Sequence, residues 1–345
     1  MQMIDTKIVI QDIGDSGRPT GKQTIIEVGT KEDGNIKRVS TIGDNLYVLK
    51  DYSLYQLNIL YETGNHGSKS RIIKRVTQKK VISQGAESIF VAKTFLTAKS
   101  VFQHGNFKDN KRNEIFQYCI NILFEFSALI EAVLSYNQVE ENALRNFEES
   151  EKSMENFIIP SISDIRTRAK TIFHKIDQIS QILRTVIKVY YPPNKKEGTT
   201  FEQLRNHFEK KHGKDNPYTE YLSKNLDFFC NTRYIRNGLD HTEANFVLIE
   251  DFKYENDVLI MPSIELKMAE CPLSERNFKN LINEILQIYP FIIEHILIMI
   301  ADDNIENNAL AFRVREIPIE KRMFKEVRYG LWSPVGQDGF FSMNF

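Results

Sequence analysis

Apolar and polar positions alternate in short runs along the first 95 residues of the chain. The runs are rich in β-branched side chains and are separated by Gly, Asp and Asn; they include TKIVIQDI, KQTIIEVG, IKRVSTIG and NLYVLKDYSLYQLNILYET. Alternation of this kind is typical of strands joined by turns, because successive side chains of a strand point to opposite faces of a sheet. The sequence therefore predicts a β-rich domain over residues 1–97.

From about Ala98 onward, apolar positions recur every three or four residues, which is the spacing of an amphipathic helix. Residues 115–134 and 165–187 each carry a long apolar stripe, and the acidic stretch 140–155 between them is expected to fray. His174 lies one position off the second stripe. It is expected to be a packed or surface residue without a chemical role.

Three further helices are predicted in the same region. Thr199 and Glu202 have the spacing of a capping box and open the first of them. Residues 221–241 form the second, with a core-facing stripe that includes Leu222, Leu226 and Phe229. Ser274 is expected to cap the third, which carries an apolar face up to Ile300.

The fold class predicted from these patterns is α+β. A helical bundle is expected over residues 98–302, and the run NFVLIEDFKYENDVLIMPSIEL within it predicts a β-hairpin insertion with a turn at 255–257. Residues 303–345 form a C-terminal tail with apolar positions such as Trp332. We expect this tail to dock on the body of the protein or on a partner.

The candidate chemistry lies at the end of the 221–241 helix, which reads Arg236-Asn237-Gly238-Leu239-Asp240-His241. On an unbroken helix the side chains of Arg236 and His241 would point about 140° apart. Gly238 suits a left-handed residue that ends a helix, so the chain is expected to bend there and bring the two side chains together. A guanidinium binds phosphate oxygens and an imidazole transfers protons near neutral pH, so such a pair favours phosphoryl chemistry.

This motif resembles that of the HEPN superfamily (higher eukaryote and prokaryote nucleotide-binding), helical domains that carry an Arg, four to six residues and then a His, often with Asn after the Arg. The resemblance covers roughly residues 98–302. The same loose spacing also occurs from Arg205 to His212, but Asn237 and the position at a helix end favour the later copy. The competing interpretation is that Arg236 and His241 only cap the helix end, where cations meet the negative pole of the helix dipole.

The resemblance implies a phosphate-binding role for Arg236, a proton-transferring or phosphate-contacting role for His241, and an orienting role for Asn237. Asp240 and Arg233 are expected to support them. The implied activity is that of a metal-independent endoribonuclease, without a cofactor, that leaves 2′,3′-cyclic phosphate and 5′-hydroxyl ends. Active members of the family dimerise, so the expected form is a homodimer with a composite active site.

The expected biological setting is a toxin or an antiviral abortive-infection system, with RNA as substrate and an antitoxin or an activating molecule as a possible partner. The alternative is a non-catalytic nucleotide-binding, RNA-binding or scaffold protein of the same family. A metal nuclease has little support, because no cluster of His and carboxylates has the spacing of metal ligands.

Two basic neighbourhoods are candidates for contacting RNA. The first lies within residues 64–80, and the second precedes the motif helix. The candidate residues are Lys69, Arg71, Lys74 and Arg75 in the first and Arg205, Lys210 and Lys211 in the second. The first run also fits a solvated strand at a sheet edge, which lysines commonly protect.

Composition limits the remaining possibilities. The 345 residues carry a formal net charge of −1, which excludes a general polyanion binder of the histone type. Three cysteines, Cys119, Cys230 and Cys271, show no paired spacing and fit a reducing cytoplasm. The amino terminus lacks the pattern of a signal peptide, and the apolar segment 285–300 is interrupted by polar residues, so no membrane association is expected.

Overall fold

The computed structural model of the chain describes residues 2–13, 19–61, 73–103, 105–151, 158–193, 199–241, 246–306 and 311–334. These residues show strands first and helices after them, so the α+β prediction is confirmed. The chain forms two compact units, residues 1–124 with 301–345, and residues 125–300. The divisions therefore fall within helices and not at the predicted boundaries of 97/98 and 302/303.

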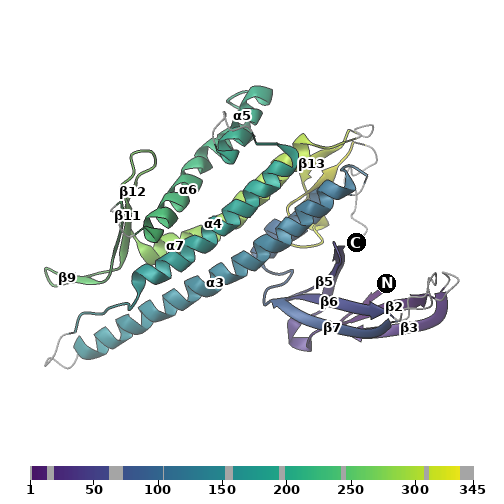
Figure 1. Ribbon diagram of the computed structural model, residues 1–345, viewed down its shortest axis with the longest axis horizontal. Helices are drawn as coiled ribbons and strands as arrows, with labels where there is room; N and C mark the ends of the chain where they lie inside the picture. Colours follow the sequence, from purple (N-terminus) through teal and green to yellow (C-terminus); the bar gives the residue numbers. More distant parts are fainter. Residues whose placement is uncertain are drawn as a thin grey trace. The chain divides into compact units, whose positions relative to one another are not determined.

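The amino-terminal strands of the first unit form two antiparallel sheets, drawn in purple and blue in Figure 1. One sheet has the order β1-β2-β3 and the other the order β4-β5-β6-β7. The strands are β1 (Gln2–Ile4), β2 (Lys7–Ile13), β3 (Pro19–Glu27), β4 (Ile36–Ile42), β5 (Asn45–Lys50), β6 (Leu54–Tyr61) and β7 (Ile73–Ile82). Each strand pairs with its neighbour in sequence, as expected for strands joined by short turns.

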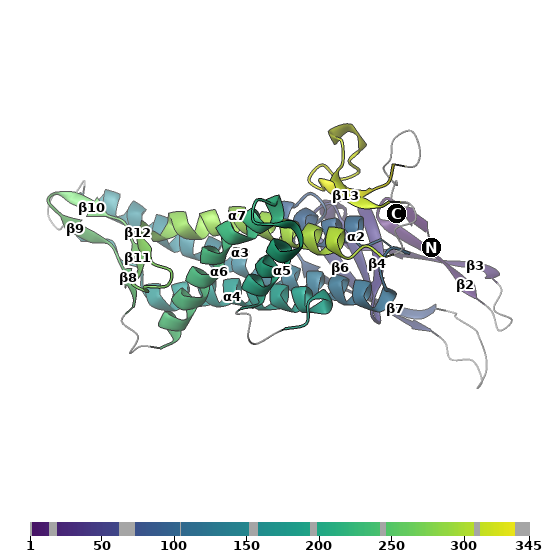
Figure 2. The ribbon, with the colours of Figure 1, turned by 90° about the horizontal axis from the view of Figure 1, so that it is seen from above.

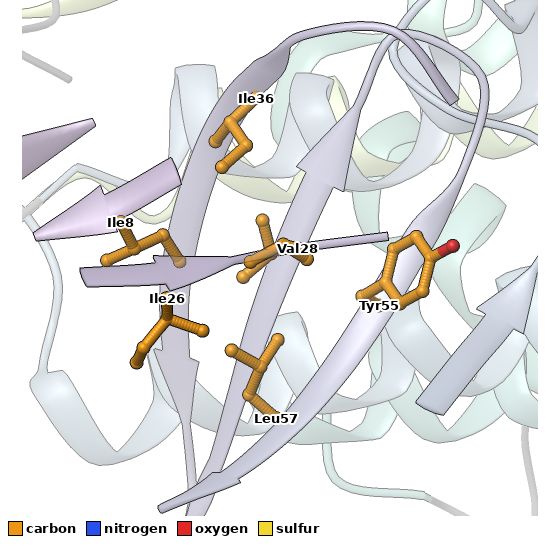
Figure 3. Close-up of a cluster of buried hydrophobic side chains, with 7 residues drawn as sticks. Ile8, Ile26, Val28, Ile36, Tyr55 and Leu57 are labelled. Carbon is orange, nitrogen blue, oxygen red and sulfur yellow. The ribbon is translucent and has the colours of Figure 1, made fainter. Parts of the chain in front are cut away.

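A cluster of buried apolar side chains joins the two sheets (Figure 3). Ile8 and Ile26 come from the first sheet, and Val48 and Leu57 come from the second. Ile8 and Val48 are fully buried. Burial of apolar side chains from both sheets removes their surface from water and holds the strands together.

The first unit also contains short helices and two late strands. Its remaining elements are α1 (Ile89–Val91), a π-helical turn (Ala92–Leu96), α2 (Thr97–Val101), the start of α3 (Asp109–Glu151), β13 (Arg313–Glu316) and β14 (Tyr329–Trp332). Ser100 Oγ donates a hydrogen bond to the carbonyl of Tyr329, with a length of 2.5 Å. The described part of the C-terminal tail therefore packs on this unit.

The second unit is mainly helical, and its helices run side by side in Figures 1 and 2. It comprises the rest of α3, α4 (Ile165–Tyr190), α5 (Thr200–His212), α6 (Pro217–Asp240) and most of α7 (Phe278–Asp303). The predicted capping box of Thr199 and Glu202 is present at the start of α5. Apolar stripes such as Ile172, Ile176 and Ile179 of α4 face the core.

The acidic end of α3 does not fray before Glu151, contrary to the prediction. Glu140 is fully buried there, and the ammonium of Lys279 on α7 lies 3.2 Å from its carboxylate. Tyr136 also donates a hydrogen bond to Glu140, one helical turn away. The pairing with Lys279, which sequence spacing does not reveal, supplies a counter-charge for the buried Glu140 carboxylate.

A hairpin follows α6, as predicted, and a three-stranded sheet is formed by the same part of the chain. β8 (Val247–Glu250) and β12 (Leu273–Asn277) flank β11 (Ser263–Leu266), while β9 (Lys253–Glu255) pairs with β10 (Val258–Ile260). Asn256 and Asp257 form the turn, with φ values of 51° and 59°. Ser274 lies in β12, so the prediction that it caps the last helix is wrong.

Cysteine pairing also differs from the expectation. Cys230 of α6 and Cys271 form a disulfide with their Cα atoms 6.3 Å apart, whereas Cys119 is a buried free thiol. Disulfides are uncommon in a reducing cytoplasm. Cysteine usage therefore no longer supports the cytoplasmic assignment, which stays a prediction.

Among the residues that the structure describes, two helices are long and apolar enough to cross a membrane when judged by length and composition alone. They are residues 109–150 of α3 and the whole of α7. In the most apolar part of α7, 67% of the residues are buried inside the protein, and in α3 the share is 44%. Burial of this kind is what a core helix shows, so the two helices are only weak evidence for a membrane protein.

Candidate active site on helices α4 and α6

Helix α6 is not bent at Gly238, contrary to the prediction. The helix continues to Asp240, and His241 is its C-terminal capping residue, with φ −102° and ψ 103°. The amide of His241 still donates to the carbonyl of Asn237, at 3.1 Å. The helix therefore runs unbroken from Arg236 to Asp240, and the chain does not fold back to bring His241 toward Arg236.

Gly238 serves a different purpose, namely the close approach of the strand region that follows. A Cβ atom at this position would collide with Val247 Cγ2 and would lie 2.7 Å from Phe246 Cε2. Gly238 is buried, and its φ is not in the left-handed region. The absence of a side chain therefore lets the start of β8 pack directly against α6.

The side chain of His241 is exposed and makes no hydrogen bond or ion pair with any residue that the structure describes. Arg233 is also exposed. Asn237 does contact the motif arginine, because its Oδ1 accepts a hydrogen bond of 3.0 Å from Arg236 Nη1. Of the predicted site residues, hydrogen bonds and ion pairs between described residues bring together Arg236, Asn237 and Asp240, but not His241 and Arg233.

Helix α4 faces this end of α6 with a stripe of polar side chains. The stripe consists of Arg166, Lys170, His174, Asp177, Gln181 and Arg184. Its members are spaced by four, four, three, four and three residues, so they fall on one face at 3.6 residues per turn. The stripe meets α6 at Arg166, whose Nη2 donates to the carbonyl of Gly238 at 2.9 Å.

At the centre of the cluster, His174 and Lys170 of α4 both bind the Asp240 carboxylate of α6. His174 Nε2 lies 2.7 Å and Lys170 Nζ 2.9 Å from Asp240 Oδ1. The His174 side chain is 33% exposed, so solvent and a ligand can reach the imidazole. A carboxylate on one nitrogen of an imidazole fixes its tautomer and orientation, which is the arrangement of a proton-transferring histidine.

Arg236 lies beside this group and faces two carboxylates. Its Nε is 3.2 Å from Asp240 Oδ2 and 3.7 Å from Asp177 Oδ2. Asp177 is buried and also accepts a hydrogen bond of 2.7 Å from Gln181. The Arg236 side chain is 31% exposed, so part of the guanidinium remains accessible while the carboxylates hold it in place.

The electrostatics of the cluster keep Asp240 ionised. Burial by itself raises the pKa of Asp240, but hydrogen bonds from His174 and Lys170 and the charge of Arg236 outweigh it and lower the pKa to about 2. Three cations of the cluster, Lys170, Arg184 and Arg236, pair with two carboxylates, Asp177 and Asp240. A fourth cation, Arg166, contacts the carbonyl of Gly238. The excess of positive charge suits an anionic ligand.

The predicted RNA-contacting residues lie elsewhere. Lys69 and Arg71 are outside the described residues. Lys74 and Arg75 are exposed on β7, the edge strand of its sheet. Arg205 pairs with Glu209 at 3.3 Å on α5, where Lys210 and Lys211 are exposed. Their part in binding RNA stays a prediction.

In the described ranges, no three side chains of His, Cys, Asp or Glu gather as ligands of one metal ion would. No protein-family model, curated protein or solved structure matches this chain. The HEPN resemblance therefore stays a prediction that rests on the motif Arg236, Asn237 and His241.

His174 is a site residue that was not predicted from the sequence, where it was assigned no chemical role. Compared with the apolar positions alone, His174 lies outside the stripe that faces the core. Measured against the other polar positions of 166–184, it belongs to a regular stripe that includes Lys170 and Asp177. The available signal was the recurrence of polar residues at helical spacing beside the apolar stripe of the same helix.

Proposed function

We propose that the chain is a metal-independent endoribonuclease that cleaves RNA to 2′,3′-cyclic phosphate and 5′-hydroxyl ends. The observation that carries the proposal is the 2.7 Å contact of His174 with Asp240, flanked by Lys170 and Arg236. It combines an imidazole, which can transfer a proton, with two cations, and these are the parts that this reaction requires. The HEPN resemblance of Arg236-Asn237 supports the same activity.

His174 is the proton-transferring residue in this proposal. With Nε2 held by Asp240, the other ring nitrogen, Nδ1, accepts the proton of a ribose 2′-hydroxyl as that oxygen attacks the adjacent phosphorus. The bond from phosphorus to the 5′-oxygen then breaks, and the 5′-oxygen takes up a proton. The HEPN resemblance implies that His241 transfers a proton or contacts a non-bridging phosphate oxygen.

Arg236 and Lys170 stabilise the negative charge that accumulates on the phosphorane oxygens. Both side chains lie against Asp240, at 3.2 Å and 2.9 Å, so they are held close to the imidazole before RNA arrives. Preorganised cations cost no rearrangement at the moment of reaction. Asn237 fixes the guanidinium from the other side through its hydrogen bond to Nη1.

The proposal includes a homodimer, a toxin or antiviral setting, and a partner that silences or activates the nuclease. These parts rest on the resemblance. A symmetric dimer can place its two copies of the motif opposite each other around the twofold axis. The exposed His241 side chain of one chain could then complete the site of the other.

A non-catalytic nucleotide-binding or RNA-binding role is the second candidate. It is favoured by the engagement of Arg236 with two carboxylates, Asp240 and Asp177, because such a network also serves to join two helices. In that case the excess cations would hold an anion without turning it over.

Incubation of purified protein with total RNA in EDTA distinguishes the two roles. The nuclease produces fragments with cyclic phosphate ends, whereas a binder protects RNA and produces none. His212→Ala, which changes a histidine outside the α4–α6 cluster, is the control and should cleave like the natural protein. Absence of cleavage by a dimeric preparation that binds RNA would refute the enzyme and favour the binder.

A further inference from the structure

A small pocket opens in the helical unit, on side chains that the α4–α6 cluster does not use. It has a volume of about 110 Å³ and is lined by residues of α4, α6, β12 and α7. Its walls include the buried side chains of Phe173, Ile235 and Ile285, whereas Ile288 is 37% exposed and marks the side open to solvent. The pocket is therefore apolar inside and can be entered from solvent.

The disulfide between Cys230 and Cys271 joins two walls of this pocket. Cys230 directly precedes Asn231 of α6, and Cys271 lies two residues before Leu273 of β12. Asn231 and Leu273 both line the pocket. Walls that are already cross-linked lose little freedom when a ligand enters, and this favours binding.

One lining residue, Asn231, carries a polar atom whose bonding capacity is unused. Asn231 Oδ1 is buried and accepts no hydrogen bond from any residue that the structure describes. The neighbouring hydroxyl of Thr232 does not supply one, because it donates to the carbonyl of Phe228 at 2.8 Å. A buried carbonyl oxygen without a hydrogen bond is costly, and a ligand that donates one removes this cost.

Charge and size narrow the class of ligand. Arg276 and Glu284, the charged residues of the lining, pair with each other at 2.6 Å, so the pocket offers no net charge to an ion. Apolar cavities of about 150 Å³ bind a single benzene ring, and this slightly smaller pocket is open on one side. Phe173 and Phe228 favour an aromatic ligand, because aromatic rings attract one another edge to face.

We propose that this pocket binds a small neutral aromatic molecule of the phenol class, with one ring and one hydrogen-bond donor. The ring lies among Phe173, Phe228 and Ile285, and its hydroxyl donates to Asn231 Oδ1. None of the lining residues has a part in the proposed nuclease. The site is therefore independent of that activity.

Titration of the full-length protein with phenol, followed by NMR of ¹³C-labelled isoleucine methyl groups, tests the site directly. Ile235, Ile285 and Ile288 line the pocket, so their signals should shift with one common dissociation constant. Ile8 lies in the core of the strand-rich unit, and its signal should stay unchanged. Absence of a common, saturable shift of the three pocket signals would overturn the proposal.

A pair of variants locates the binding. Ile288→Trp fills the open side of the pocket and should weaken phenol binding by at least about tenfold, because a filled site has no room for the ring. Ile260→Trp changes an isoleucine of β10 with nearly the same exposure, 38%, outside the pocket lining, and should bind phenol like the natural protein. Equal phenol affinity in the natural protein and Ile288→Trp would contradict the site.

Asn231→Leu tests the proposed hydrogen bond, with toluene as a ligand of similar shape that lacks the donor. The ratio of phenol affinity to toluene affinity should fall by about threefold or more in this variant, as expected for the loss of one hydrogen bond. Comparing the ratio between two proteins cancels the different hydration of the two ligands. An unchanged ratio would contradict the role of Asn231, and if the variant does not fold, the titration of the natural protein decides.

The same titration with N-acetyltyrosine amide distinguishes a free ligand from the side chain of a partner protein. This probe carries the phenol ring together with the peptide groups that a partner's tyrosine would bring. Affinity equal to or weaker than that of phenol supports a free small molecule. Binding at least about tenfold tighter than phenol would overturn the proposal in favour of a docked tyrosine side chain.

Discussion

Asp240 is the residue on which the α4–α6 cluster depends, because Lys170, His174 and Arg236 all contact its carboxylate. Removal of its charge would leave three donors without their shared acceptor. The cluster is therefore both a candidate catalytic group and a joint between two helices. These two roles respond differently to pH and to mutation, so they can be separated.

The stabilising effect of Asp240 should depend on pH. Its pKa in the folded protein, about 2, is below the ordinary value of 3.8, so its contribution is fully present above about pH 4 and is lost as the pH falls through 2. We expect Asp240→Asn to lower the free energy of unfolding by about 1–2 kcal/mol at pH 7. The difference between the two proteins should shrink between pH 4 and pH 2 in urea unfolding, and a difference independent of pH would contradict this explanation.

Single residues were predictable from the sequence only where local spacing decides their surroundings. Arg236, Asn237 and Asp240 were identified because they are neighbours on one helix turn. His174 was not identified, because its partner Asp240 lies 66 residues further along the chain. Which face of α4 meets α6 is decided by packing of both helices, and sequence spacing does not contain that information.

At the scale of elements, Gly238 shows how a tertiary contact overrides a local preference. Glycine near a helix end commonly adopts a left-handed conformation, and that tendency motivated the predicted bend. Here Val247 of strand β8 packs directly against the helix at position 238. A side chain at this position would collide with Val247, which explains why the residue is a glycine. The spacing of apolar residues, in contrast, located most strands and helices correctly. An element that buries one face must carry apolar residues at the spacing of that face, and this pattern can be read from its own sequence.

Gly238→Ala should destabilise the helical unit. The added methyl group would collide with Val247 and crowd Phe246, and overpacking of this kind costs about 1–3 kcal/mol. The higher helix propensity of alanine returns up to about 1 kcal/mol, so we expect a net loss. Thermal unfolding measures it, with exposed Ser223→Ala of the same helix as a control that should change the melting temperature little. An increase in melting temperature would show that β8 does not approach α6 as described.

At the scale of the whole molecule, the candidate nuclease cluster lies in the helical unit. The described C-terminal strands belong to the strand-rich unit, so the chain returns to its first unit after the helices. This return could not be predicted from the order of elements, because a terminal segment carries no local signal for its docking partner. The predicted division was into three consecutive segments, whereas the first compact unit combines residues from both ends of the chain.

The proposed composite site makes activity depend on protein concentration. If two chains complete the site, the rate of RNA cleavage per chain should fall on dilution below the dissociation constant of the dimer, as determined by analytical ultracentrifugation. Monomers and dimers of equal specific activity would contradict the composite site while leaving the cluster of a single chain intact as the catalytic unit.

The rate of metal-independent RNA cleavage by His174→Ala, compared with the natural protein, tests the central claim most directly. Loss of one proton-transferring group should lower the single-turnover rate in EDTA by about 10²–10⁴-fold. Circular dichroism and sedimentation of the variant show whether its fold and association are preserved. His174→Ala that is folded, associates normally and cleaves RNA at the natural rate would contradict the account, whereas a folded variant with the expected loss would support it.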